Sequence, residues 1–231
     1  MAKSEIIKLF AKNEIDTEVA LRQLKVLLAT FPNLDAASWV DKELSGYDIN
    51  DELPVYRKTG GSLQCDLLAY GLIANNIGLP IRPDAPDDIR DLCNNAYFRE
   101  SIGALKMIIK KDGQIAFDIS PDLYPFIMKY SLRPTTSILR AKKVVSRTDI
   151  MCIITAVDKR ILDILLYLEK EFGVLDNLDL PTKEKSEGDI QIIQNTILNY
   201  IYVDNSITIG DENKISDSIM TVNSQTEKGK R

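Results

Sequence analysis

The sequence contains no histidine. This absence excludes Ser-His-Asp and Cys-His catalytic relays, histidine general bases and histidine-containing zinc sites. An enzyme built from this chain would have to rely on carboxylates, Lys, Tyr, Ser or Cys. The nucleotide-binding patterns G-x-x-x-x-G-K-[ST] and G-x-G-x-x-G are also missing, which argues against a P-loop ATPase and a dinucleotide-dependent enzyme.

Cysteine is scarce, and long apolar runs are missing. Cys65, Cys93 and Cys152 are odd in number and widely spaced, so they are expected to be reduced, structural thiols rather than a disulfide framework or a metal site. The N-terminus lacks the apolar core of a signal peptide. The longest apolar stretches, 151–157 and 161–168, are too short to cross a bilayer. We therefore expect a cytoplasmic protein with no membrane partner and no cofactor.

The overall composition is that of a globular protein. Apolar residues make up 45% of the 231 residues and charged residues 27%, which is enough apolar material for a sizeable core. The net charge of -5 argues against indiscriminate binding to nucleic acid, although a local basic patch remains compatible with it.

Hydrophobic periodicity and capping residues predict an α+β fold that is mainly helical. Helices are expected from Asp16 or Thr17 to Phe31, over 35–44 with Gly46 as a left-handed cap, from Asp84 or Asp87 onward, over 99–110 and over 121–130. Strands are expected over 114–119 and 137–145. Residues 62–77 are ambiguous between helix and strand, and the flanking glycines favour a β-hairpin that turns near Gly71. Ser146 begins the longest helix, which ends at Gly173.

The sequence predicts a change of architecture after residue 180. Residues 1–180 are expected to form the α+β domain, 181–189 a linker, 190–222 a β-rich tail resembling a β-solenoid, and 223–231 a disordered end. Isolated isoleucines lie among Asn, Ser, Asp and Gly in this tail, namely Ile207, Ile209, Ile215 and Ile219. One small β unit cannot bury such a face alone, so we expect it to make homo-oligomers. A hairpin folded onto the domain and a disordered tail are the alternatives.

A basic segment lies between Lys129 and Arg160. It holds eight basic and two acidic residues in a chain of net charge -5. The candidate anion- or nucleic-acid-binding residues are Arg140, Lys142, Lys143 and Arg147, next to the helix start at Ser146. The alternative is a solvated face paired with acidic neighbours. Asp66 and Asp118 fall in predicted strands, but two carboxylates without a motif specify no metal site.

Two motifs resemble the signature of the AbiTii family. One is WVDKELSGY, from Trp39 to Tyr47, and the other is LPVYR, from Leu53 to Arg57. Weaker similarity extends over residues 5–174, with Asp158 in place of an expected arginine. The motif residues are expected to form a structural cluster in which Arg57 bonds Glu43, rather than a binding site.

The resemblance implies a part in bacterial abortive infection, a form of anti-phage defence. It implies no catalytic residues, so whether the chain is an enzyme stays open. The first hypothesis is a self-assembling scaffold, sensor or effector that contacts a protein of the same defence locus or a phage protein. The second is a nucleic-acid-targeting or ligand-gated effector that uses the basic segment 129–160.

Overall fold

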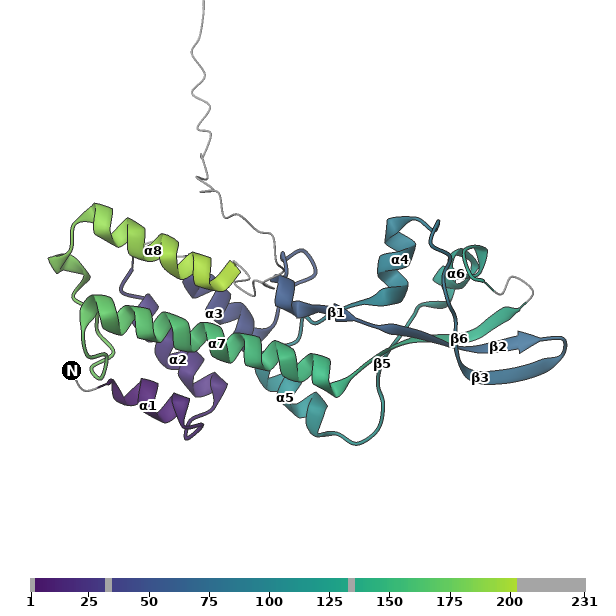
Figure 1. Ribbon diagram of the computed structural model, residues 1–231, viewed down its shortest axis with the longest axis horizontal. Helices are drawn as coiled ribbons and strands as arrows, with labels where there is room; N and C mark the ends of the chain where they lie inside the picture. Colours follow the sequence, from purple (N-terminus) through teal and green to yellow (C-terminus); the bar gives the residue numbers. More distant parts are fainter. Residues whose placement is uncertain (1–2, 32–34, 133–135, 203–231) are drawn as a thin grey trace, which may run out of the picture.

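The computed structural model describes residues 3–31, 35–132 and 136–202. Within these ranges the chain has an α+β fold with eight α-helices and two antiparallel sheets. The molecule is elongated, with a helical lobe at one end and a sheet lobe at the other (Figure 1). The predicted fold class is therefore confirmed for the α+β part.

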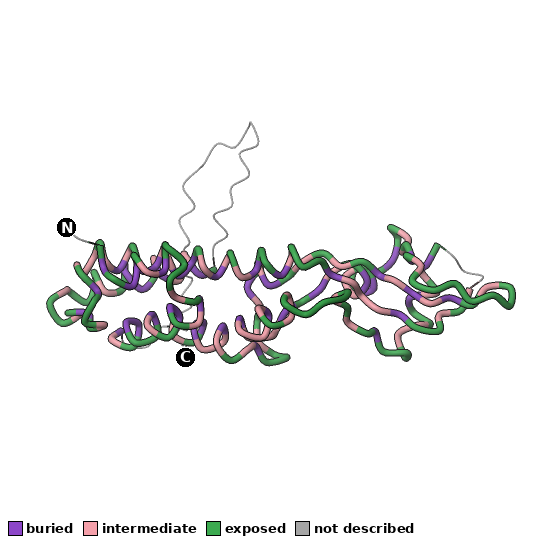
Figure 2. The backbone as a smooth tube through the Cα atoms, turned by 90° about the horizontal axis from the view of Figure 1, so that it is seen from below, coloured by how far each residue is buried: buried purple, intermediate pink, exposed green. Residues whose placement is uncertain are grey.

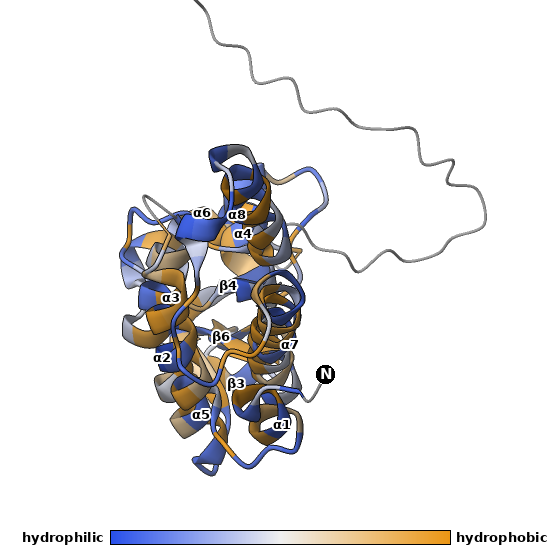
Figure 3. Cartoon of the chain, turned by 90° about the vertical axis from the view of Figure 1, so that its left-hand side faces the viewer, coloured by the Kyte–Doolittle hydropathy of each residue, from blue (hydrophilic) through white to orange (hydrophobic). Residues whose placement is uncertain are grey.

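The helical lobe combines both ends of the described chain. It consists of α1 (Glu5–Ala11), α2 (Thr17–Leu28), α3 (Asp35–Ser45), α5 (Ile102–Lys110), α7 (Arg147–Phe172) and α8 (Glu187–Tyr202), with the short 3-10 helices η1 (Val55–Arg57) and η3 (Thr182–Glu184). Seen from its end, α2, α3 and α5 lie on one side, α1 and α7 on the other, and α8 above them (Figure 3). Their buried apolar residues form one continuous core.

Helix α7 is the central element of this lobe. The Ser146 side chain accepts from the Asp149 main-chain N–H while Asp149 bonds back to Ser146, a capping box that fixes the start of the helix. The helix ends at Gly173, where φ is 85°, and its 26 residues span about 39 Å. Apolar residues at three- and four-residue steps, among them Ile150, Ile153 and Val157, are buried against α1, α2, α5 and α8. The predicted long helix is thus confirmed.

The predicted β-rich tail is wrong over residues 190–202, which lie in α8. Ile193, Ile197 and Ile201 recur at four-residue steps and belong to the main core. Ser186 accepts a hydrogen bond from the Asp189 main-chain N–H at 3.2 Å, which is the bonding pattern of a helix start. Helical packing continues to Tyr202, whereas the remainder of the predicted tail lies outside the described residues.

The sheet lobe has a core of its own. Its four-stranded sheet has the order β3-β2-β6-β5, and the strands and the segments packed on them are β2 (Ser62–Ala69), β3 (Leu72–Gly78), β5 (Ile115–Asp118), β6 (Ser137–Val145), α4 (Asp87–Asn94), η2 (Pro121–Leu123) and α6 (Tyr124–Lys129). Leu63, Cys65 and Leu67 alternate along β2 and are buried beneath α4 and α6. The intervening residues face outward, so this sheet has one covered and one open face.

A narrow connection joins the lobes. The strands β1 (Lys58–Gly60) and β4 (Asn95–Tyr97) pair with each other, and β6 leads through Ser146 directly into α7. Buried residues run along the inside of both lobes and through this connection (Figure 2). Phe98 and Phe117 make an edge contact at 5.6 Å between ring centres, which links the connection to β5.

Most predicted elements of the first 180 residues are present, with shifts at their ends. The hairpin is confirmed: Tyr70 and Gly71 have φ values of 49° and 78°, as a two-residue type I′ turn requires. The predicted helix 99–110 begins only at Ile102, because the Ser101 hydroxyl accepts from the Ala104 main-chain N–H at 3.2 Å. The predicted helix 121–130 is divided between η2 and α6.

Within the described residues, no helix combines the length and the apolarity that a membrane crossing requires. Two of the three cysteines, Cys65 and Cys93, are buried as predicted, whereas Cys152 is exposed on α7. Burial raises the pKa of each buried thiol to about 11, so neither is an activated nucleophile.

Candidate functional site

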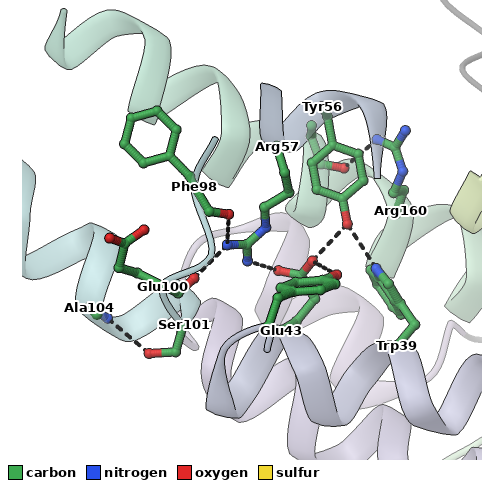
Figure 4. A network of polar contacts seen from close by, with 11 residues as sticks. Trp39, Glu43, Tyr56, Arg57, Phe98, Glu100, Ser101, Ala104 and Arg160 are labelled. Carbon is green, nitrogen blue, oxygen red and sulfur yellow. Dashed lines mark hydrogen bonds and ion pairs between the residues drawn. The ribbon is translucent and has the colours of Figure 1, made fainter. Parts of the chain in front are cut away.

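The two family-like motifs meet in a buried polar cluster inside the helical lobe (Figure 4). The side chains of Glu43, on α3, and Arg57, at the end of η1, are both 0% exposed and form an ion pair, which confirms the predicted bond. Arg57 Nη1 also donates to the main-chain oxygens of Phe98 and Glu100. The pair therefore joins α3, η1 and the segment between β4 and α5.

Three aromatic side chains complete this cluster. Tyr47 and Tyr56 each donate a hydroxyl hydrogen bond of 2.7 Å to Glu43 Oε1, and Trp39 Nε1 donates to Tyr56 Oη at 2.8 Å. The Glu43 carboxylate is thus paired and fully hydrogen-bonded, as a buried charge must be. Burial, and next the charge of Glu43, raises the pKa of both tyrosine hydroxyls far above the usual range, so both remain proton donors.

Helix α7 contributes Arg160 to the same cluster. The Arg160 guanidinium carbon lies 4.1 Å from the centre of the Tyr56 ring, a favourable cation–aromatic geometry. Its Nε donates to the main-chain oxygen of Ile201 at 2.9 Å, and its Nη1 to that of Ala156 at 3.0 Å. The cluster therefore also holds the end of α8, and its hydrogen bonds and cation–aromatic contact connect α3, η1, α7 and α8.

The four predicted anion-binding residues do not share one surface. Along β6, Arg140 and Lys142 line the outer face of the sheet, whereas Lys143 lies on the inner face with the buried Ala141. Lys143 Nζ donates to the main-chain oxygen of Asn95. Burial lowers the pKa of the Lys143 ammonium. Lys143 thus supports the connection between the lobes.

Arg147 has a structural role as well. As the first residue of α7, it donates to the main-chain oxygens of Ile109, Lys111 and Gly113. Ile109 lies in the last turn of α5, where carbonyl groups have no partner within the helix, and Lys111 and Gly113 follow the helix directly. Arg147 therefore caps α5, and only Arg140 and Lys142 of the four stay available on one face.

Arg140 and Lys142 lie in a polar network across that outer face. Arg140 Nη2 donates to Asp118 Oδ1 at 2.8 Å, and Lys142 Nζ to Gln114 Oε1 at 2.8 Å. Asp66 on β2 accepts from the Asn76 main-chain N–H at 2.8 Å. Asp66 and Asp118 therefore bond different partners, Asn76 and Arg140. Within the part of the chain that is described, no group of three or more His, Cys, Asp or Glu side chains is arranged to hold a metal ion.

Apolar side chains are exposed at the free end of the sheet lobe. This apolar end consists of Leu68, Tyr70, Leu72, Ile73 and Leu139, which are 38%, 88%, 74%, 61% and 49% exposed. They surround the β2–β3 turn and the adjacent part of β6. Leu68 and Ile73 are paired on the open face of the sheet, and exposed apolar neighbours of this kind are typical of interaction sites. The apolar end is therefore the candidate contact site.

Sequence reasoning identified the hairpin but missed this exposed end. A signal was present, because two adjacent apolar residues flank the turn on each side: Leu67 with Leu68, and Leu72 with Ile73. Successive strand residues point to opposite faces, so one residue of each pair has to leave the core. Leu67 is buried accordingly, while Leu68 pairs with Ile73 on the open side.

The predicted oligomerisation residues, Ile207, Ile209, Ile215 and Ile219, lie outside the described residues. Among comparisons with known proteins, a family model described as AbiTii matches residues 4–194. The match spans both lobes and reaches into α8. No curated protein and no solved structure matches the chain.

Proposed function

The chain belongs to the AbiTii family, and from this premise we propose that it acts in abortive infection through protein–protein contacts, as a self-assembling component. The family assignment supports the biological process, which is anti-phage defence. The molecular role is inferred from the surface of the protein. The partner is a protein of the same defence locus or a phage protein.

The apolar end of the sheet lobe is the observation that carries this proposal. Its most exposed members, Tyr70 and Leu72, lie at the β2–β3 turn. This hairpin extends away from the helical lobe (Figure 1). Strand β3 is also an edge strand, and its seven residues, LIANNIG, carry no charge. Uncharged edge strands pair readily with a strand of another chain, since no side chain repels the approach. Both features favour a protein partner.

Self-assembly is proposed for the segment that follows α8. The isoleucines Ile207 and Ile209 alternate with polar residues, and Ile215 and Ile219 follow at longer intervals. Such a segment has too few apolar residues for a core of its own, and stacking of copies would supply the missing partners. The family match ends before this segment, which favours a role as an attached assembly device.

Phage plating tests the contact surface. We expect the double variant Leu72→Asp/Ile73→Asp to lose protection by at least tenfold, the change that about 1.4 kcal/mol of lost contact energy produces. Both residues are exposed, so the variant should fold normally. Met107→Asp on α5, at an equally exposed apolar position of 65%, is the matched control. Full protection by a folded Leu72→Asp/Ile73→Asp variant would refute the proposal.

A further inference from the structure

The outer face of the four-stranded sheet is hollowed at Asp66. The register of β2 shifts against β3 between Cys65 and Leu67, and against β6 between Asp66 and Leu67. The pairing of β2 with β3 and its pairing with β6 are therefore both irregular next to Asp66. Such bulges bend strands and redirect side chains, and they recur beside binding sites. Here they leave an open pocket of about 340 Å³.

The lining of this pocket is polar throughout. It consists of Gln64, Asp66, Asn75, Asn76, Arg140 and Lys142. The amides and the carboxylate come from β2 and β3, whereas both cations come from β6. The cationic side suits a phosphate group, and the amide and carboxylate side suits hydroxyl groups, which both donate and accept hydrogen bonds.

The two cations can exchange their present partners for a ligand at small cost. Arg140 and Asp118 are 61% and 70% exposed in their ion pair, and ion pairs between such exposed side chains contribute little to stability. Within the described residues, the Lys142 ammonium donates to the neutral amide of Gln114. Arg140 and Lys142 are two residues apart on β6, about 7 Å along the strand, so both side chains can reach one phosphate.

Asp66 is held in position at the base of the hollow. The hydrogen bond from the Asn76 main-chain N–H fixes its Oδ1 at 2.8 Å. Asn76 has a φ of 54°, a conformation that asparagine adopts more readily than most residues. The carboxylate is thereby oriented beside the amides of Gln64 and Asn75. A volume of about 340 Å³ lies within the range of small-molecule sites.

We propose that this pocket binds a phosphorylated sugar. The phosphate contacts Arg140 and Lys142, and the sugar hydroxyls contact Asp66 and the amides opposite. The site is distinct from the apolar end, and it uses two of the four basic residues of the sequence prediction. It requires neither catalysis nor a metal ion.

Isothermal titration of the full chain with ribose 5-phosphate tests this site, with inorganic phosphate and free ribose as comparison probes. We expect ribose 5-phosphate to bind more tightly than either comparison probe. The variant Arg140→Gln/Lys142→Gln should weaken its binding at least tenfold, the loss expected for a charge-assisted contact. Arg90→Gln, an exposed cation on α4, is the matched control and should bind as the wild type does.

Two further variants test the hydroxyl side. Asp66→Asn should weaken binding of ribose 5-phosphate but not of inorganic phosphate, and its thermal midpoint reports whether the variant still folds. Asn75→Ala, at an exposed position, gives a second test if Asp66→Asn does not fold.

Four outcomes overturn the proposal. The first is no saturable binding of ribose 5-phosphate up to about 10 mM, since a specific site binds at lower concentrations. The second is equally tight binding of inorganic phosphate, and the third is unchanged binding of ribose 5-phosphate by Arg140→Gln/Lys142→Gln. The fourth is tighter, salt-sensitive binding of a single-stranded oligonucleotide, which would indicate a nucleic-acid surface instead.

Discussion

Arg160 on α7 bridges Tyr56 and the last turn of α8: its guanidinium carbon is 4.1 Å from the Tyr56 ring centre, and its Nε donates to Ile201 O at 2.9 Å. Tyr56 belongs to one of the two family motifs, whereas Ile201 lies beyond the end of the family match at residue 194. The contact therefore makes α8 part of the helical lobe rather than an appendage.

Arg160→Met is expected to loosen α8. The variant loses the cation–aromatic contact and the bond to Ile201 while it keeps an apolar side chain of similar length. A loss of about 2–4 kcal/mol of stability is expected from these two contacts together. In Arg160→Met, hydrogen exchange of main-chain amides should be faster in the last turns of α8 than in α2. Equal protection of the two helices, with unchanged stability, would show that Arg160 does not hold α8.

Arg57→Met should be among the most destabilising single changes in the chain. It leaves the Glu43 carboxylate buried without its cation, which costs about 3–5 kcal/mol. Glu43→Gln/Arg57→Met removes both charges, and chemical denaturation should show it to be more stable than Arg57→Met alone. If the double variant is the less stable of the two, the charge of Glu43 is not what destabilises the single variant.

Gly46 and Gly113 offer a matched pair of glycine positions. Both have a φ of 100°, so alanine is strained at either site by about 1–3 kcal/mol. A Cβ at Gly46 would also lie 3.0 Å from Arg99 O, whereas nothing lies within 4 Å at Gly113. Gly46→Ala should therefore lower the thermal midpoint more than Gly113→Ala. Equal losses would mean that backbone strain alone matters and that the approach of Arg99 does not.

Glu169 should make stability depend on pH in the acid range. Burial alone would raise the pKa of this carboxyl, but hydrogen bonds from Lys3 and Ser4 prevail and lower it from 4.5 to about 2. Because the pKa is lowered in the folded state, the stabilisation is fully present above pH 4.5 and is lost as the pH falls toward about 2.

The matched variant is Glu169→Gln, which keeps an oxygen that can accept from Ser4. Denaturation at several pH values should show wild type more stable than Glu169→Gln above pH 4.5. The difference should shrink as the pH falls toward about 2. If the stability difference between wild type and Glu169→Gln does not change with pH, the charge of Glu169 does not contribute to stability and only its hydrogen bonds do.

Local patterns predicted those elements whose signals were unambiguous. Ser146 and Gly173 delimit α7, and glycines on both sides identified the hairpin. The pairing of Glu43 with Arg57 was also predictable, because Arg57 is the single charged residue of LPVYR and the other motif supplies a carboxylate for it. In these cases local preference and tertiary packing favour the same result.

Other features depend on the rest of the molecule. The segment IQIIQNTILNYIY after Asp189 is compatible with a strand or a helix. It forms a helix because Ile193 and Ile197 then pack together into the core. The inward direction of Lys143 follows from the register of β6 with β2, which composition does not reveal. The pocket at Asp66 results from two bulges, each of which needs a neighbouring strand to exist.

The same features change how the basic segment should be tested. Reversing the charges of Arg140, Lys142, Lys143 and Arg147 together would remove the cap of α5 and the support of Asn95. Loss of defence would then reflect misfolding. The pair Arg140 and Lys142 alone separates binding from folding, because both lie on the outer face.

Solution mass by light scattering tests the proposed self-assembly most directly. The full chain should be compared with a chain that ends at Tyr202, so that all of α8 is kept, and with a full-length variant in which Ile207, Ile209, Ile215 and Ile219 are serine. Self-assembly through the segment after α8 predicts a homo-oligomer for the full chain and a smaller mass for both altered chains. Equal masses for all three would contradict it.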